Sequence, residues 1–425
     1  MHHHHADPDS LDLGRTVADL GPGVARWPLL IGAVGLAAAA IEAIIRIWAV
    51  PTEYSLERLM FSYLHGYLYF LAISLGALFF VIVHHLTRAG WSVTVRRIAE
   101  VLAANLWPTF ALLFLPILVA VWLRSGLVFP WSDPDYVASH PVVHHKIGYF
   151  NVPWDQEASF PLFFTLRAVL YFAIWGFLGR SFLNRSVEQD VTGEPSISKR
   201  FEGRSAWGVL VTFLTVTFAS VDWAMSLDPE WFSTMFGVYY IAGCAVSFFA
   251  ALWVIVYFLQ SRGALVEAVT VEHQHDIGKY LHGFIIFWTY IAFCQFLLIW
   301  YADLPEETQW YLVRQQGGWQ WISLLLVLCH FAIPFFGLMS RHVKRNRKAL
   351  LFWCCWMLVF HWFDIYYLVM PQAAHGSLPL SLIDVTTTIG IGGIAIAGAL
   401  RTAASHALVP IRDPRLAESL AFHNI

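Results

Sequence analysis

Charged residues are scarce in this sequence. They make up 13% of the chain, about half the share typical of soluble globular proteins, whereas 58% of its residues are hydrophobic and the mean hydropathy is +0.58. Long apolar segments recur from Pro28 to the C-terminal region. These features exclude a soluble domain with a single anchor and predict an all-α, polytopic membrane protein. No basic patch is interleaved with base-stacking aromatic residues, so no nucleic-acid partner is expected.

Cysteine motifs are also missing. All five cysteines lie in apolar segments, and none belongs to a CxxC, CxxCH or four-cysteine cluster: Cys244, Cys294, Cys329, Cys354 and Cys355. This argues against iron–sulfur clusters, c-type haem and structural zinc in this chain. We therefore expect no metal site and no bound redox cofactor, and we expect the cysteines to be free thiols packed among helices.

A cleaved signal peptide is not expected. Residues 1–27 are polar and lack a basic stretch followed by a short apolar core. The His run at residues 2–5 is given no function. We expect a cytoplasmic N-terminal segment (1–27), a transmembrane helical domain (28–404) and a cytoplasmic C-terminal tail (405–425).

About 20 apolar residues are needed to cross a membrane as a helix. The sequence contains ten such segments, at residues 28–49, 58–86, 98–123, 160–182, 206–226, 235–260, 280–301, 319–340, 349–370 and 380–401.

The distribution of basic residues predicts the orientation. With the N-terminus inside, twenty Lys and Arg residues lie in the inner segments. Only four then lie outside: Arg58, Arg124, Lys146 and Arg314. The excess favours a multi-pass protein with two cytoplasmic termini. The one long loop, 124–159, is then extracytoplasmic, and it either docks an outer subunit or simply covers the helix ends.

Ionisable groups inside the spans are costly and mark functional candidates. Counting 1.5 Å per residue, eight of them fall in one layer of the outer half: Glu42, Arg46, His65, Arg167, Asp222, His361, Asp364 and Asp384. Glu42 and Arg46 are four residues apart, so they share a helix face and can pair. We expect a polar pocket at this depth, close to Asp222.

For most residues of this layer, an ordinary structural role is an alternative to a functional one. Glu42–Arg46 can be an internal ion pair, His65 a hydrogen-bonded core residue, Arg167 a snorkelling cation and Asp384 a helix cap. Asp222, His361 and Asp364 are the strongest candidates for proton handling, because a carboxylate beside a desolvated imidazole can titrate near neutrality. His65 and Arg167 are candidates to line a quinone pocket with Asp222 and His361.

A second, sparser polar set lies deeper or toward the cytoplasm. It comprises Asn105, Tyr290, Gln295, His330, His282, Asp276, Lys279, His84 and His85. Together with Glu42, Arg46 and Asp384, the residues His282, Tyr290 and His330 are candidates for a proton path. Ordinary interhelical hydrogen bonding is the alternative. The glycine-rich run from Gly390 to Gly393 is interpreted as close helix packing rather than as a phosphate loop.

Several stretches resemble one family. They are residues 64–80, 85–97, 217–236, 298–308 and 340–346, and the segment His361-Trp-Phe-Asp364-Ile-Tyr-Tyr-Leu-Val-Met-Pro371. Together they resemble the second quinone-binding-type membrane subunit of bacterial alternative complex III, within the NrfD/polysulfide-reductase membrane-subunit superfamily. The resemblance covers roughly residues 58–371.

The resemblance implies two four-helix bundles plus a peripheral helix pair. It also implies a subunit, itself without a redox cofactor, of a quinol:cytochrome c (or equivalent acceptor) oxidoreductase. Implied partners are a homologous membrane subunit, a multihaem cytochrome c, iron–sulfur subunits and lipids, and a terminal oxidase is allowed as a further partner. Quinone or quinol near the outer face and proton translocation through the bundles are implied as well, with Asp222, His361 and Asp364 in the matching motifs.

Two other functions compete with this one. A secondary transporter also needs membrane-buried charges, but its site typically lies at the midplane between broken helices. A purely structural anchor would use the polar layer for assembly alone.

Overall fold

The computed structural model describes residues 13–21, 24, 26–47, 52–151, 160–373 and 378–424. The His run and residues 152–159 of the long loop lie outside this range. The described residues form helices and no strand, apart from one isolated bridge between Thr16 and Ala407. Ten segments are long and apolar enough to cross a membrane, which confirms an all-α polytopic membrane protein.

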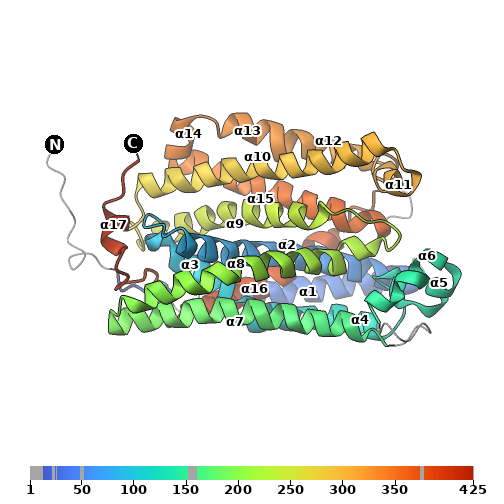
Figure 1. The fold of residues 1–425 in the computed structure, drawn as a ribbon, viewed down its shortest axis with the longest axis horizontal. Coiled ribbons are helices and arrows are strands. Elements are labelled where there is room, and N and C mark those ends of the chain that lie inside the picture. The colour runs from blue at the N-terminus through green and yellow to red at the C-terminus, as the bar shows by residue number, and fades with distance from the viewer. Residues whose placement is uncertain are drawn as a thin grey trace.

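The ten spans follow the predicted order (Figure 1). They are α1 (Arg26–Ile47), α2 (Thr52–Leu86), α3–η3–α4 (Val93–Ala104, Leu106–Phe110, Ala111–Trp122), α7 (Leu162–Thr192), α8 (Ser196–Trp223), α9 (Phe236–Ser261), α10 (Val271–Ala302), α12–η7–α13 (Trp319–Leu325, Leu326–Ala332, Ile333–Gly337), α15 (Arg347–Val369) and α16 (Leu382–Ala403). The shorter elements are η2 (Val17–Leu20), η4 (Pro130–Ser132), α5 (Pro134–Ser139), α6 (Pro141–Lys146), η5 (Ile147–Tyr149), η6 (Met225–Leu227), α11 (Pro305–Val313), α14 (Arg341–Arg345), η8 (Met370–Ala373) and α17 (Leu416–Leu420).

Several helices are longer than predicted. α7 has 31 residues and continues ten residues beyond the predicted end at 182, and α8 begins at Ser196 rather than at 206. At 1.5 Å per residue, α7 is about 46 Å long, well beyond a hydrocarbon core of roughly 30 Å. Polar helical turns therefore extend α7 beyond the hydrocarbon core. A count of consecutive apolar residues cannot detect such turns. Gly193, in a left-handed conformation with φ of 67°, ends α7.

The helices pack as two bundles and a pair. α2, α3–α4, α7 and α8 contact one another in a closed ring, and α9, α10, α12–α13 and α15 form a second ring. α2 packs on α9 and joins the bundles, while α1 packs chiefly on α16 at the periphery. The predicted architecture of two four-helix bundles and a peripheral pair is confirmed.

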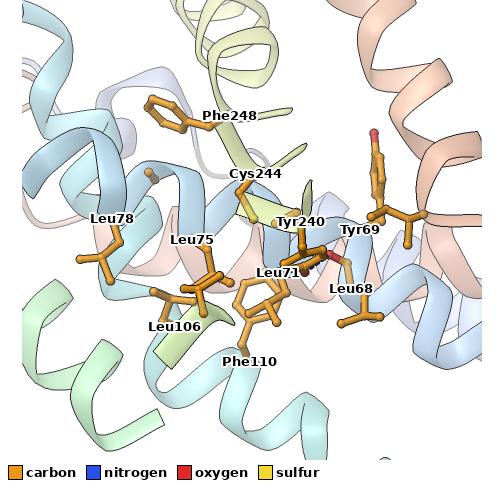
Figure 2. Close-up of a cluster of buried hydrophobic side chains, with 14 of the residues drawn as sticks. Leu68, Tyr69, Leu71, Leu75, Leu78, Leu106, Phe110, Tyr240, Cys244 and Phe248 are labelled. Atoms are coloured by element: carbon orange, nitrogen blue, oxygen red, sulfur yellow. Dashed lines mark hydrogen bonds between the residues drawn. The ribbon is translucent and has the colours of Figure 1, made fainter. Parts of the chain in front are cut away.

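The junction between the bundles is apolar and close-packed. Figure 2 shows Leu71 and Leu75 of α2 lying among Tyr240 and Cys244 of α9 and Phe110 of η3. A Cβ at Gly76 would lie only 2.1 Å from the Cys244 carbonyl oxygen, so the two backbones touch there. Such packing makes the two bundles one rigid unit at mid-depth.

The peripheral pair is held together by glycines. A Cβ at Gly393 would lie 2.4 Å from the Gly32 nitrogen, and one at Gly35 would lie 2.7 Å from the Gly390 nitrogen. The interpretation of the glycine run as close helix packing is therefore confirmed.

The two ends of the molecule differ. α17 and α14 lie at one end, here called the terminal end, and α5, α6 and α11 lie at the other, the loop end (Figure 1). At the terminal end the C-terminal tail is fixed to α3, because Arg96 pairs with Asp413 and Ser419 donates to the Trp91 carbonyl at 2.6 Å.

At the loop end, the described part of the long loop covers the helix ends. Trp131 is buried, stacks on Phe150 with ring centroids 4.0 Å apart, and donates to Ser226 at 3.2 Å. Lys146 lies 5.4 Å from the Phe232 ring. This part of the loop packs on its own bundle, and docking of an outer subunit on it stays a prediction.

Candidate functional site

The predicted polar layer is divided into separate clusters. One surrounds Asp364 in the second bundle, one surrounds Asp222 in the first bundle, and one joins α16 to α1 and α2. The eight residues therefore do not line one common pocket around Asp222. The clusters differ in one respect that matters chemically, which is whether the buried carboxylate has a cationic partner.

The Asp364 centre consists of Asp364, His361, His330, Tyr239 and Trp288. Tyr239 of α9 donates its hydroxyl to one carboxylate oxygen, and Trp288 of α10 donates to the other at 3.2 Å. His361 Nδ1 lies 3.3 Å from Asp364 Oδ2. The His330 ring lies 6.2 Å from the His361 ring, centroid to centroid, and 4.0 Å from that of Trp288.

The local sequence explains this arrangement. His361 and Asp364 are three residues apart on α15, so they share one helix face. Gly243 of α9 makes room for them, because a Cβ there would lie 2.9 Å from His361 Cε1. His330 lies in η7, a π-helical segment immediately before Pro334. Proline lacks the backbone N–H that would continue the helical hydrogen bonds. Segments of π-helix are frequent at functional sites.

Asp364 has no cationic partner among the described residues. It is 1% exposed, and no Arg or Lys of the described chain forms an ion pair with it. Both nitrogens of His330 and Nε2 of His361 are buried without a hydrogen-bond partner within the described ranges. The Asp364 carboxyl group therefore lies beside imidazole nitrogens that have no other described partner, an arrangement in which a proton can pass between side chains.

The same residues offer metal-ligating atoms. Ligand atoms of His330, His361 and Asp364 lie within 4.8 Å of one another. Both Asp364 oxygens, however, already accept hydrogen bonds from Tyr239 and Trp288. A metal ion bound here would therefore compete with these two donors for the carboxyl oxygens.

Asp222 is a different kind of carboxylate. Arg167 of α7 binds it bidentately, with Nε 2.8 Å from Oδ2 and Nη2 2.9 Å from Oδ1, and the Tyr171 hydroxyl donates at 2.8 Å. Arg167 also donates to the Tyr149 carbonyl at 2.5 Å and stacks on the Tyr149 ring. This bidentate pair joins α7 to α8, and the contacts of Arg167 with Tyr149 tie the described part of the long loop to the bundle.

The third cluster joins α16 to its neighbours near the loop end. Asp384 accepts from Arg58 at 2.5 Å and from Ser62 at 2.8 Å. The predicted Glu42–Arg46 pair is present at 3.0 Å, and Ser381 donates to Glu42 at 3.0 Å. These hydrogen bonds make the cluster a connection of α16 with α1 and α2, although Glu42 Oε2 has no partner among the described residues.

His65 lies between the third cluster and the Asp364 centre. Its Nε2 is 3.1 Å from the Trp362 carbonyl oxygen, and its ring meets those of Trp362 and Tyr366 edge-on at 4.6 and 5.3 Å. His65 and Arg167 therefore lie in different clusters, rather than on one quinone pocket with Asp222 and His361.

The deeper polar set is mostly satisfied locally. Asn105 donates to the Ala395 carbonyl at 2.9 Å, Asp276 pairs with Lys279 at 2.5 Å, and His84 lies 2.8 Å from the Phe80 carbonyl. His85 stacks on the Phe182 ring.

Two members of the predicted proton path differ in environment. Tyr290 is 60% exposed on the outer face of α10, away from the bundle interior. His282 is half-buried, lies 5.3 Å from the Phe335 ring, and has a buried Nε2 without a partner in the described chain. Only His282 of this pair faces its own bundle.

A polar chain leads from the second bundle toward the loop end. Ser233 donates to Gln295 at 3.1 Å, and Gln295 donates to the Tyr311 hydroxyl at 3.4 Å. No hydrogen bond between described residues joins this chain to Tyr239 of the Asp364 centre.

Asp228 and Arg314 lie at the outer end of this chain. Burial raises the pKa of the Asp228 carboxyl above its ordinary value, although Arg314 and a hydrogen bond from Gln372 at 3.2 Å act against the rise. Burial also lowers the pKa of Arg314 to about 10. Arg314 stacks 3.4 Å from the Trp310 ring centroid and donates to three backbone carbonyls.

Several partners were not predicted from the sequence. Tyr239, Trp288 and Tyr171 lie inside predicted spans and have no role among the predicted site residues, and Arg58 enters only as one of the four basic residues predicted to lie outside. The available signal was a polar-tipped aromatic inside an apolar helix, since buried Tyr and Trp usually find a hydrogen-bond partner.

No protein-family model matches this chain, and no curated protein matches it either.

Proposed function

We propose that this chain is a membrane subunit of a quinol:electron-acceptor oxidoreductase, and that its Asp364 centre passes protons. The observation that carries the proposal is a fully buried carboxylate that has hydrogen-bond donors but no cation among the described residues. The two donors fix the position of the carboxyl group, and His361 Nδ1 lies 3.3 Å from Asp364 Oδ2, so this pair is placed to pass a proton during turnover.

The geometry around Asp364 supports this chemistry. His361 Nδ1, 3.3 Å from Asp364 Oδ2, is close enough for direct proton transfer after a small movement. His330 continues the series of titratable groups, with its ring centroid 6.2 Å from that of His361. A proton can therefore reach Asp364 through His361 without passing through Asp222.

The oxidoreductase part of the proposal rests on the resemblance of residues 58–371 to the alternative complex III subunit. On this proposal the chain binds no redox cofactor, and haem c and iron–sulfur clusters belong to partner subunits. The Lys and Arg distribution supports an extracytoplasmic loop end and cytoplasmic termini. The Asp364 centre then lies on the outer side, where quinol is expected to release its protons.

Asp364→Asn in the intact complex tests the proposal. Asn retains the size and the acceptor oxygen but cannot carry a proton, so proton translocation per electron should fall about tenfold or more. Asp303→Asn, at an exposed loop-end position, is the matched control. Both variants are checked for assembly, and proton release is measured in vesicles during quinol oxidation.

A structural anchor is the second candidate function. It is favoured by the ion pairs Arg167–Asp222 and Arg58–Asp384, which are saturated and connect elements. Wild-type turnover and wild-type proton release in an assembled Asp364→Asn complex would favour the anchor over the proton path.

A further inference from the structure

A large apolar cavity lies in the terminal half of the molecule, where the peripheral pair meets both bundles. Its volume is about 460 Å³, and its lining comes from α1, α2, α3, α9, α15 and α16. Small side chains on two helices leave the space open, chiefly Ala251 of α9 and Ala395, Ala399 and Ala403 of α16. A volume of this size is typical of small-molecule sites.

The cavity offers almost no free polar group to a ligand. Tyr69 donates to the Leu358 carbonyl at 3.1 Å, and Asn105 donates to that of Ala395 at 2.9 Å, while Asn105 Oδ1 has no partner among the described residues. Arg97 is held by Glu100 and Asp190. Ser74 and His406 are the other polar side chains in the lining, and the remaining residues are apolar. Water is disfavoured in such a space, and an empty apolar cavity destabilises a fold in proportion to its volume.

One side of the cavity opens toward the surrounding membrane. Phe258 of α9 is 43% exposed and Ile396 of α16 is 48% exposed, and both belong to the lining. Toward the terminal end, Val17 and Leu408 are buried and close the cavity, held there by the Thr16–Ala407 bridge. An occupant would therefore come sideways from the bilayer.

Basic residues flank this lateral opening. The Arg262 guanidinium lies over the Phe258 ring at 5.1 Å, and Arg401 directly follows the lining residue Leu400. Both side chains are exposed. A cation beside an apolar opening matches a phosphate head with a hydrocarbon tail, whereas a neutral isoprenoid quinone has no charge to pair with it.

We propose that the cavity holds an acyl chain of a membrane phospholipid whose head group lies at the terminal end beside Arg262. The chain fills the space between the bundles and the terminal half of α16. The peripheral pair is then held by polar bonds near the loop end and by a lipid near the terminal end.

Ala399→Phe tests this proposal because it fills the cavity from α16. Ala397→Phe is the matched control, since Ala397 lies two residues away on the same helix and is not part of the lining. The full-length protein is washed extensively in detergent, and bound lipids are quantified by mass spectrometry. Wild type and Ala397→Phe should retain about one phospholipid per chain that Ala399→Phe has lost.

Two further variants keep the result interpretable. If Ala399→Phe does not fold, Ala251→Leu fills the cavity from α9 and should show the same loss. Arg262→Gln should weaken phospholipid retention at least severalfold without filling the cavity. Equal phospholipid retention in wild type and a folded filling variant would overturn the proposal, and so would an isoprenoid quinone retained in place of the phospholipid.

Discussion

Asp222 and Asp364 are both buried carboxylates, but their partners differ in charge. Arg167 binds Asp222 through two charge-assisted hydrogen bonds. Asp364 receives hydrogen bonds from neutral groups only. Both residues are candidates because of their depth along a membrane span. Which partners each carboxylate has depends on the helices that face it, and the sequence does not give these.

Removing Arg167 should destabilise the protein, because it leaves a buried carboxylate without its cation. We expect Arg167→Ala to cost about 3–5 kcal/mol of unfolding free energy. The double variant Arg167→Met with Asp222→Leu should recover most of that loss, since both charges are removed. Thermal and denaturant unfolding in detergent measure the difference. An Arg167→Ala protein as stable as wild type would mean that Asp222 is not held as an ion.

Gly243 tests the geometry of the Asp364 centre. An alanine Cβ at this position would lie 2.9 Å from His361 Cε1 and 3.6 Å from Asp364 Oδ2, so the imidazole must move. A displacement of about 1 Å can cost roughly a hundredfold in rate, and we expect proton translocation by Gly243→Ala to fall at least tenfold.

The control for that variant lies on the neighbouring helix α10. Gly283→Ala meets nothing within 4 Å and should leave proton translocation unchanged. Equal activity in the two variants would show that the position of His361 is not critical.

At the scale of elements, interrupted helices distinguish two of the spans. The third span is broken at η3, where Trp107 has non-helical backbone angles, and the eighth contains the π-helical η7. Pro108 and Pro334 in the sequence indicate both breaks. Their consequence for His330 was not predictable, because it depends on how η7 presents that side chain to α10 and α15.

The α1–α16 pair should tolerate no bulk at its glycines. In Gly393→Leu the new Cβ would lie 2.4 Å from the Gly32 nitrogen, so the two backbones must separate. Overpacking of this kind costs about 1–3 kcal/mol or more. Gly203→Leu, at an exposed position of α8 with nothing within 4 Å, is the control and should be close to wild type. The melting temperature of the full-length protein compares them, and equal values would contradict close packing at Gly393.

At the scale of the whole molecule, the fold was largely predictable. Apolar segments of about 20 residues are dictated by membrane thickness, which is why the number and order of the ten spans were correct. Helix ends such as those of α7 and α8 were not, because polar helical turns outside the hydrocarbon leave no apolar signal. The division of the polar layer into clusters was not predictable either, since depth along a helix says nothing about its rotation.

The sidedness of the molecule can be tested by labelling. In a variant whose exposed Cys355 is replaced by Ala, a cysteine at Ser139 marks the loop end and one at Ser405 marks the terminal end. A membrane-impermeant maleimide should label only Ser139→Cys in spheroplasts, and Ser405→Cys only after lysis. The reverse pattern would contradict the orientation derived from the Lys and Arg distribution.

The central claim is that Asp364 carries an exchangeable proton, and infrared difference spectroscopy of the intact complex during turnover tests it most directly. We predict a protonated-carboxyl band that is present in wild type and in Asp222→Asn, shifts in D₂O, and is absent in Asp364→Asn. A band that persists unchanged in an assembled Asp364→Asn complex would contradict the claim.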